Sequence, residues 1–327
     1  MAPRLIARSE TWPLATTFRF SLGRRSAAEV VVAEIIDGEL RGRGEGVPYP
    51  YYGETAESVL AAIRAVAAAV ASGFDRRELQ LAMKPGAARN ALDCAFWDLE
   101  AKRAGTRVAA LAGLDPPRPL TTAYSLGLDT VERMAEAAAA HRDRPLLKLR
   151  LTGTDDLKRI CAVHEAAPGA RLIGDANERW TLRDYARNSP EFTKLGVALI
   201  EQPLSAIVDA AIGSIPHPVK VCADEACCTR VDLDRLVGKY DAVNIKLDKT
   251  GGLTEALALA DAAVARGLAV VVGGPTGTSL GAAPATLVGQ KAQFVDLSGP
   301  TLLAKDREPG LRYDGGMVEP PSLELWG

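Results

Sequence analysis

The chain has 327 residues, of which 47% are hydrophobic and 24% are charged, and its formal net charge is −2. This is the composition of an ordinary globular protein of about two domains. Basic and acidic residues nearly balance, at 39 and 41, and no run of Lys and Arg suggests nucleic-acid binding. No stretch approaches the roughly 20 apolar residues of a membrane span, and the five scattered cysteines are typical of reduced thiols, so we expect a cytoplasmic protein.

The first part of the chain mixes short strands with helices. Residues 29–49 predict two strands joined by a turn, and residues 54–73 and 85–105 predict two helices. Together they indicate an α+β unit, which we place at residues 1–117. The Gly- and Pro-rich tail has no helical period, and we expect residues 304–327 to fold back and complete this unit.

From residue 118 onward the chain repeats one pattern, in which a short apolar strand precedes a helical segment. Eight strands are predicted, at 121–126, 146–151, 170–177, 197–203, 219–225, 242–248, 268–274 and 293–299. Such alternation predicts a parallel sheet, and eight units can close into a (β/α) barrel, here residues 118–303. An open doubly wound sheet is the alternative, but the G-x-G-x-x-G turn expected after its first strand is missing.

Charged side chains stand at the carboxyl ends of these strands, where barrels of this kind have their active sites. The strand at 146–151 holds Lys148 and Arg150, which share a face because they are two residues apart. Along the next four strands the end positions are three acids and a lysine: Asp175, Glu201, Asp224 and Lys246. The intervals from Lys148 through these four residues are 22 to 27 residues long and match one strand–helix unit, so we expect all five at nearly the same height in the barrel.

Three carboxylates on neighbouring strands repel one another unless a cation neutralises them. Oxygen ligands without Cys or His favour Mg²⁺ over Zn²⁺. Each acid could instead cap the helix that follows it, but three in succession between two lysine-bearing strands favour a Mg²⁺ site. Lys246 lies four strands from Lys148, so the two would approach a bound carboxylate from opposite sides. A lysine beside a metal can act as a base, and the metal would stabilise the enediolate formed when an α-proton leaves.

A longer set of motifs resembles the enolase superfamily, in its muconate-lactonizing-enzyme subgroup, and in particular the dipeptide epimerases typified by L-Ala-D/L-Glu epimerase. The motifs are "GRGEGVPYPYYGET", "GAARNALDCAFWDLEAKRAG", "IGDANERW", "IEQPL", "CADEA", "NIKLDKTGGLTEAL" and "FVDLSGP". The resemblance implies a modified (β/α)7β barrel under a capping domain built from N- and C-terminal segments. It implies Mg²⁺ on Asp175, Glu201 and Asp224, with Lys246 as an acid/base group. It also suggests a homo-oligomer.

Two positions depart from the pattern of that subgroup. The strand at 146–151 usually carries Lys-x-Lys, and the second lysine is the other base, but here that position is Arg150. A guanidinium keeps its proton, so it is a poor base and a good clamp for a carboxylate or enolate. Dipeptide epimerases also usually carry Asp-x-Asp on the last strand to hold the substrate ammonium, and here the pair is Asp296 and Ser298.

Further substrate contacts are expected around the barrel mouth. The first loop, read at 18–29, offers Arg24 and two neighbouring arginines for a distal carboxylate, although solvated surface arginines are an equal alternative. The resemblance implies that Tyr51 lines the pocket. Asn177 stands two residues after Asp175, so we expect it to reach the same pocket. The glycine-rich segment 273–281 could present backbone N–H groups of a helix N-terminus to an anion.

Three functions remain open at this point. The first is a Mg²⁺-dependent epimerase or racemase of a dipeptide or N-acyl amino acid, which needs a base on each face, with Lys148 replacing the missing lysine. The second uses the same enolate with Lys246 as the only base, as in a dehydratase or cycloisomerase, while Arg150 stabilises charge. The third is a catalytically impaired paralogue that binds a small acid.

Overall fold

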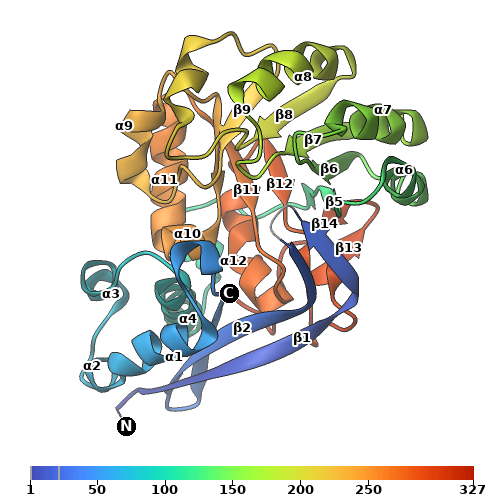
Figure 1. The fold of residues 1–327 in the computed structure, drawn as a ribbon. Helices are drawn as coiled ribbons and strands as arrows, with labels where there is room; N and C mark the ends of the chain where they lie inside the picture. Colours follow the sequence, from blue (N-terminus) through green and yellow to red (C-terminus); the bar gives the residue numbers. More distant parts are fainter. Residues whose placement is uncertain (1, 21–22) are drawn as a thin grey trace.

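The computed structural model describes residues 2–20 and 23–327, and Figure 1 shows their arrangement. The N-terminal part forms an antiparallel sheet in the order β1-β2-β3, from β1 (Arg4–Phe20), β2 (Gly23–Asp37) and β3 (Leu40–Gly46). Its helices follow in chain order: η1 (Pro50–Tyr52), α1 (Ala56–Ala65), α2 (Ala67–Ala71), α3 (Arg76–Ala82), α4 (Ala87–Ala104) and α5 (Val108–Leu111). The long β1–β2 ribbon runs beneath the barrel, and α1 to α4 pack near its N-terminal end (Figure 1).

Two details of this unit differ from the prediction. The helix expected at 54–73 is interrupted at Val66, so α1 and α2 are separate. The segment 18–29, read as a loop, belongs instead to β1 and β2 wherever it lies within the described residues. Most side chains of β1 are at least partly exposed, so this strand lacks the buried apolar alternation that would reveal it in a sequence. The hairpin of β2 and β3 is confirmed.

A row of glycines lets α4 lie directly on β3. Gly42, Gly44 and Gly46 face this helix, and a Cβ atom on any of them would lie 2.1 to 2.2 Å from one of its backbone oxygens. Any side chain there would push the helix away. The residues between them point to the other side of the sheet, as strand geometry requires. Arg43 donates to the carbonyl oxygens of the C-terminal tail, and Glu45 reaches the barrel.

Eight parallel strands form the barrel in unbroken chain order: β5 (Tyr124–Leu126), β6 (Leu146–Arg150), β7 (Arg171–Asp175), β8 (Val197–Glu201), β9 (Lys220–Ala223), β10 (Ala242–Ile245), β11 (Ala269–Gly273) and β12 (Phe294–Asp296). The first and last strands meet through a parallel bridge between Thr122 and Val295, and the Ala123 N–H donates to the Val295 carbonyl at 2.7 Å. The sheet is therefore closed, and the predicted barrel is confirmed over the open alternative.

Helices cover the outside of the barrel, and one apolar layer fills its inside. The covering segments are α6 (Val131–Ala140), α7 (Asp156–Ala166), α8 (Leu182–Lys194), η2 (Asp209–Ser214), η3 (Arg230–Asp232), α9 (Leu233–Leu236), α10 (Leu247–Thr250), α11 (Leu253–Ala265), α12 (Ser279–Gly289) and η4 (Gly299–Leu302). Each strand or its flank contributes one side chain to the inner layer: Ala123, Leu146, Ile173, Leu199, Cys222, Ala242, Val271 and Phe294. This plug forms the floor under the polar barrel mouth.

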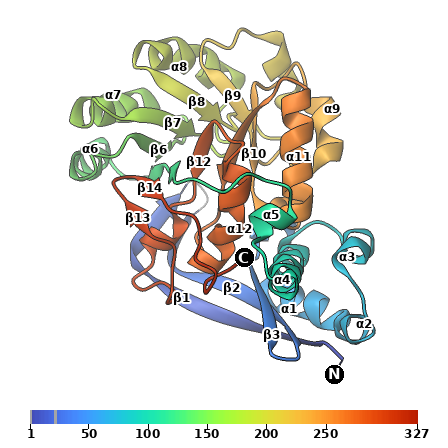
Figure 2. The ribbon, with the colours of Figure 1, turned by 180° about the vertical axis from the view of Figure 1, so that it is seen from behind.

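The C-terminal tail returns to the N-terminal unit. Its hairpin, β13 (Tyr313–Asp314) and β14 (Met317–Val318), pairs with β4 (Leu120–Thr121) at the start of the barrel. The buried Trp326 indole donates to the Cys94 carbonyl of α4 at 3.1 Å, and the chain ends close to α4 and α5 (Figure 2).

The predicted domain boundaries at 117/118 and 303/304 remain predictions. No described helix is long and apolar enough to cross a membrane.

A buried carboxylate joins the two parts and predicts how stability depends on pH. Asp93 of α4 accepts hydrogen bonds from the backbone N–H of Thr254 at 2.9 Å and from its hydroxyl at 2.6 Å. Burial raises the pKa of Asp93 to about 6, against the opposing effect of these hydrogen bonds. The folded protein therefore binds this proton more tightly than the unfolded chain does. The resulting stability is full below about pH 4 and is lost as the pH rises through about 6.

We therefore expect Asp93→Asn to flatten the pH dependence of unfolding. The loss of unfolding free energy between pH 5 and pH 8 should be smaller than in the wild type by about 1.4 kcal/mol. Urea titrations at both pH values measure it. Asp234→Asn, at an 83% exposed side chain, should leave the difference unchanged. An equal pH difference in Asp93→Asn and the wild type would contradict this prediction.

Candidate active site at the barrel mouth

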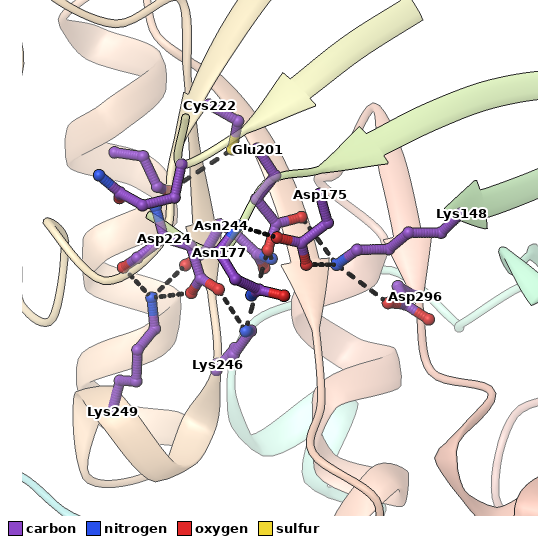
Figure 3. A network of polar contacts seen from close by, with 12 residues as sticks. Lys148, Asp175, Asn177, Glu201, Cys222, Asp224, Asn244, Lys246, Lys249 and Asp296 are labelled. Carbon is purple, nitrogen blue, oxygen red and sulfur yellow. Dashed lines mark hydrogen bonds and ion pairs between the residues drawn. The ribbon is translucent and has the colours of Figure 1, made fainter. Parts of the chain in front are cut away.

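A polar layer lies directly above the apolar plug. Side chains alternate along a strand, so the residues two positions after the plug residues point inward again. Six of them meet across the barrel: Lys148, Asp175, Glu201, Asp224, Asn244 and Asp296 (Figure 3). The structure thus brings together the three predicted metal ligands and both predicted lysines, since Lys246 joins the layer from the end of β10.

Lys148 is the centre of one half of this layer. Its Nζ lies 2.8 Å from Glu201, 3.1 Å from Asp175 and 3.2 Å from Asp296. The side chain is only 2% exposed, so these ion pairs are shielded from water. Burial by itself would lower the pKa of Lys148, but the three carboxylates outweigh it and raise the pKa. Lys148 is therefore a charged ammonium ion that ties β6 to β7, β8 and β12.

Two lysines hold Asp224 in the other half of the layer. Lys246 pairs with Oδ2 of Asp224, and the Lys249 Nζ lies 2.6 Å from Oδ1 (Figure 3). Lys249 also donates to the carbonyl oxygens of Cys227 and Asn244, each at 2.9 Å, so all its protons are used inside the protein. Burial opposes ionisation of Asp224, but both lysines outweigh burial and hold its pKa well below the usual range.

Arg150 lies one layer above Lys148 on the same strand. Its guanidinium pairs with Asp175, the residue in register with it on β7, and also donates to the Asn177 side-chain oxygen at 3.2 Å. The Arg150 Nε–H is buried and has no hydrogen-bond partner among the described residues. The cation is thus fixed on one side and retains an unused donor.

The donor set can be compared with the needs of a divalent cation. Among residues 2–20 and 23–327, no three or more His, Cys, Asp or Glu side chains are arranged to hold a metal ion as they stand. The reason is visible in Figure 3, where ammonium groups already engage the carboxylates. Yet Asp175 and Glu201 share one cation, the Lys148 Nζ, and they and Asp224 offer only hard oxygen donors. The residues fit a Mg²⁺ site chemically, and occupancy would require the lysines to give up contacts.

A cavity of about 330 Å³ opens above the polar layer. Six of the predicted residues form part of its wall as expected: Arg150, Lys246, Tyr51, Asn177, Asp296 and Ser298. Lys148 is different, since it lies beneath the wall and is covered by its carboxylate partners. The cavity wall also includes Glu225, whose Oε2 is buried and has no hydrogen-bond partner in the part of the chain that the structure describes.

The structure does not bring Arg24 to this cavity. Arg24 lies on a separate surface hollow with Arg19, its partner in the β1–β2 register. Its neighbour Arg25 lines the cavity instead. Successive side chains of a strand point to opposite faces, so only one of two adjacent arginines can face the cavity. The amino-acid sequence of the segment does not show which one it is.

The anion site expected at segment 273–281 is also corrected. The N-terminus of α12 is already occupied by carboxylates of the protein. Glu45 accepts from the Thr278 N–H at 2.8 Å and from its hydroxyl, and Asp306 accepts from the Ser279 N–H at 3.0 Å. Arg307 pairs with Glu45 at 2.9 Å. These contacts satisfy the helix terminus with the protein's own side chains.

Three residues of the site escaped sequence reasoning. Lys249 follows Lys246 by three residues, one turn of α10, which places both on the same side of that short helix. Asn244 precedes Lys246 by two residues and donates to Glu201 at 2.7 Å. Gln202 directly follows Glu201 and binds the Asp224 backbone. Spacing could have found the first two, because they share a face with a predicted site residue.

Comparison with known families identifies the chain. Residues 130–324 match the family model described as "Enolase C-terminal domain-like". Residues 3–113 match "Mandelate racemase / muconate lactonizing enzyme, N-terminal domain". The chain belongs to the enolase superfamily, in the mandelate racemase/muconate lactonizing enzyme family.

Individual proteins and crystal structures show which members of the family the chain resembles. The chain is 45% identical over 309 residues to L-Ala-D/L-Glu epimerase of Escherichia coli, covering 94% of this chain and 96% of the relative. It is 41% identical over 300 residues to N-acetyl-D-glutamate racemase of a Pseudoalteromonas species, covering 91% and 95%. Among crystal structures, an enolase family member from Agrobacterium tumefaciens with homology to dipeptide epimerases, with bound sodium and L-Ala-L-Glu, matches at TM-score 0.98 and 50% identity, covering 99% and 100%. Dipeptide epimerase from Enterococcus faecalis, complexed with Mg and L-Leu-L-Tyr, matches at TM-score 0.90 and 26% identity, covering 98% of each chain.

These matches confirm three predictions: the superfamily, the capped barrel, and the resemblance to isomerases of the dipeptide-epimerase type. They leave the roles of individual residues as predictions.

Proposed function

We propose that this protein is an isomerase that inverts the carbon next to a carboxylate in a dipeptide or an N-acyl amino acid. The observation on which this rests is the placement of Lys246 and Arg150. They reach one cavity from β10 and β6, strands four places apart in the barrel, above a floor of three carboxylates. The relatives with 45% and 41% identity, an epimerase and a racemase, support the same reaction class.

Asp175, Glu201 and Asp224 would hold Mg²⁺. Bound there, the ion would supply electrostatic stabilisation for the negative charge that builds up on the substrate carboxylate as the α-proton leaves. Two structural relatives were crystallised with a metal ion and a dipeptide, sodium in one case and Mg in the other, which supports a cation at this position. Asn244 keeps Glu201 oriented through its hydrogen bond.

Lys246 is the proton acceptor on one face of the substrate. As a neutral amine, its Nζ takes the α-proton, so the C–H bond breaks and an N–H bond forms. Asp224 pairs with Lys246, and Asn244 lies beside this pair. Burial by itself would lower the pKa of Lys246, but the Asp224 carboxylate outweighs burial and raises it. Proton abstraction therefore requires Asp224 to release Lys246. Lys249 would keep Asp224 in place when it does so.

Inversion also needs a proton from the opposite face, where Arg150 meets the cavity. Lys148 is shielded beneath Arg150 by three ion pairs, so it does not simply replace the missing lysine. A guanidinium gives up its proton reluctantly and removes one from carbon poorly. This observation supports a second candidate function, in which Lys246 is the only base and Arg150 holds the enolate, as in a dehydratase or cycloisomerase.

The cavity suits a substrate with a second acidic group. Arg25 enters from the capping sheet and lines the cavity. We therefore assign to Arg25 the role expected of Arg24, recognition of a distal carboxylate, with Tyr51 and Asn177 as further contacts. Asp296 and Ser298 would meet the substrate amino or acylamino group. The names of both relatives, L-Ala-D/L-Glu epimerase and N-acetyl-D-glutamate racemase, support a glutamate residue at the reacting position.

We also propose a cytoplasmic location, which the five free cysteines support. A small carboxylate remains the proposed partner. The predicted absence of nucleic-acid binding and the predicted homo-oligomer are untested by these observations.

Removing the Lys246 amine should abolish the chemistry. With Mg²⁺ in D₂O, wild-type protein should incorporate deuterium at the α-carbon of L-Ala-L-Glu or N-acetyl-L-glutamate, and EDTA should stop it. Lys246→Ala should lower exchange, followed by NMR, by about 10³-fold. Lys158→Ala, at a lysine 73% exposed, should exchange normally. Unchanged turnover in Lys246→Ala would refute the assignment.

A second lysine should strengthen inversion. We expect Arg150→Lys to raise the ratio of inversion to α-proton exchange by about 10-fold or more, because an amine transfers a proton in both directions more readily than a guanidinium. Chiral chromatography gives inversion, and NMR gives exchange. Arg159→Lys, outside the cavity, is the control. If the wild type already inverts as fast as it exchanges, the one-base candidate is excluded.

Substitution of Arg25 and of its neighbour Arg24 tests whether Arg25 binds the distal carboxylate of the substrate or only adds positive charge near the cavity. Arg25→Gln should raise KM for glutamate-containing substrates by about 10- to 100-fold, since a charge-assisted hydrogen bond contributes about 1.5–3 kcal/mol. Arg24→Gln removes the same charge outside the cavity and should change KM less than about twofold. L-Ala-L-Ala, without the distal carboxylate, should be affected equally little by both. Equal effects of the two variants would contradict the role of Arg25.

A further inference from the structure

Gln202 occupies a strained position between two residues of the proposed cation site. It directly follows Glu201 at the end of β8, and its φ of 34° lies in the left-handed region that side chains other than glycine rarely adopt. Its own backbone is paired on both sides, with the N–H donating to the Cys222 carbonyl and the carbonyl accepting from the Glu178 N–H, each at 2.8 Å. Such strain persists only where the surroundings enforce it.

The Gln202 side chain is fully buried and uses every hydrogen-bonding group it has. Its Oε1 accepts from the backbone N–H of Asp224 at 2.8 Å and from that of Ala226 at 3.1 Å. Its Nε2 donates to the Leu204 carbonyl at 2.8 Å and to the Tyr240 hydroxyl oxygen at 3.0 Å. A side-chain amide is needed here, because only an amide presents an acceptor and two donors at these places.

The contacts continue outward to the flank of the barrel. The Tyr240 hydroxyl donates to Asp209 at 2.9 Å, and the other Asp209 oxygen pairs with Lys239 at 2.6 Å. Both Tyr240 and Asp209 are buried. A buried network in which every group is satisfied is rigid, because any displacement leaves a polar atom unpaired. Asp209, Tyr240 and Gln202 thus form a brace that ends on the Asp224 amide.

We propose that Gln202 is a positioning residue that sets the separation of Glu201 and Asp224. It is joined to Glu201 through the chain and to Asp224 through the amide hydrogen bond, while Lys249 holds the Asp224 carboxylate. Gln202 does not line the cavity, so it acts on the substrate only through these two carboxylates. This inference rests on the proposed function, because it assumes that both carboxylates hold the cation.

Binding of Mg²⁺ itself tests the proposal without relying on activity. In the full chain, calorimetry with Mg²⁺ alone should show at least a tenfold weaker affinity in Gln202→Met, and the rise in Tm on adding Mg²⁺ should shrink. Tyr240→Phe, which removes the hydroxyl that joins Gln202 to Asp209, should weaken Mg²⁺ binding by a few-fold. If Gln202→Met does not fold, the Mg²⁺ affinity of Tyr240→Phe tests the proposal in its place.

Tyr185→Phe is the matched control. Tyr185 is another buried tyrosine, and its hydroxyl donates to the Val219 carbonyl at 3.2 Å, at the far end of β9 from Asp224. It should lower Tm about as much as Tyr240→Phe yet leave Mg²⁺ affinity within twofold of the wild type. Wild-type affinity in Gln202→Met and Tyr240→Phe would overturn the positioning role alone. A wild-type protein that does not bind Mg²⁺ would overturn the proposed function and this inference with it.

Discussion

The barrel mouth depends on the mutual neutralisation of buried charges. Four buried carboxylates, at the ends of β7, β8, β9 and β12, converge on one another, and lysines from β6 and the end of β10 meet them there. A buried charge that loses its partner costs about 3–5 kcal/mol, so these groups are bound to one another as a set. Lys148 and Asp296 also join strands on either side of the β5–β12 closure. The same ion pairs therefore stabilise both the closed barrel and the arrangement of the site.

The same neutralisation defines what the site can do. Lys246 is useful as a base only when Asp224 is no longer its partner, since an adjacent carboxylate keeps an ammonium charged. Asp224 is in turn fixed from behind, by Lys249 on its carboxylate and by Gln202 on its amide. A carboxylate anchored in this way can change its partner in the cavity without moving its backbone. The three lysines of the site thus have three different positions: Lys148 is enclosed by carboxylates beneath the cavity wall, Lys246 faces the cavity, and Lys249 lies behind Asp224.

The capping unit completes the cavity from outside the barrel. Glu45, on the side of β3 opposite the glycine row, binds the N-terminus of α12 and pairs with Arg307, which also pairs with Glu10 of β1. These contacts hold the capping sheet against the β11–α12 loop, and Gly274, Pro275 and Thr276 of that loop are part of the cavity wall. Arg25 projects from the same sheet. The part of the protein that we propose for the distal end of a substrate is therefore positioned by these ion pairs.

The sequence by itself determined the architecture and the composition of the site. Strand–helix alternation with nearly constant intervals favoured a closed barrel over an open doubly wound sheet, and the strand ends placed Asp175, Glu201, Asp224 and Lys246 at the barrel mouth. Tertiary structure decided how these groups pair. A sequence shows that Lys148 and Arg150 share a face, but only the register with β7 and β8 shows that Lys148 is enclosed by carboxylates while Arg150 reaches the cavity. Likewise, only the direction of one strand separates Arg25 from Arg24. Pairing and orientation depend on contacts between residues distant in the chain, and spacing along the chain contains no information about them.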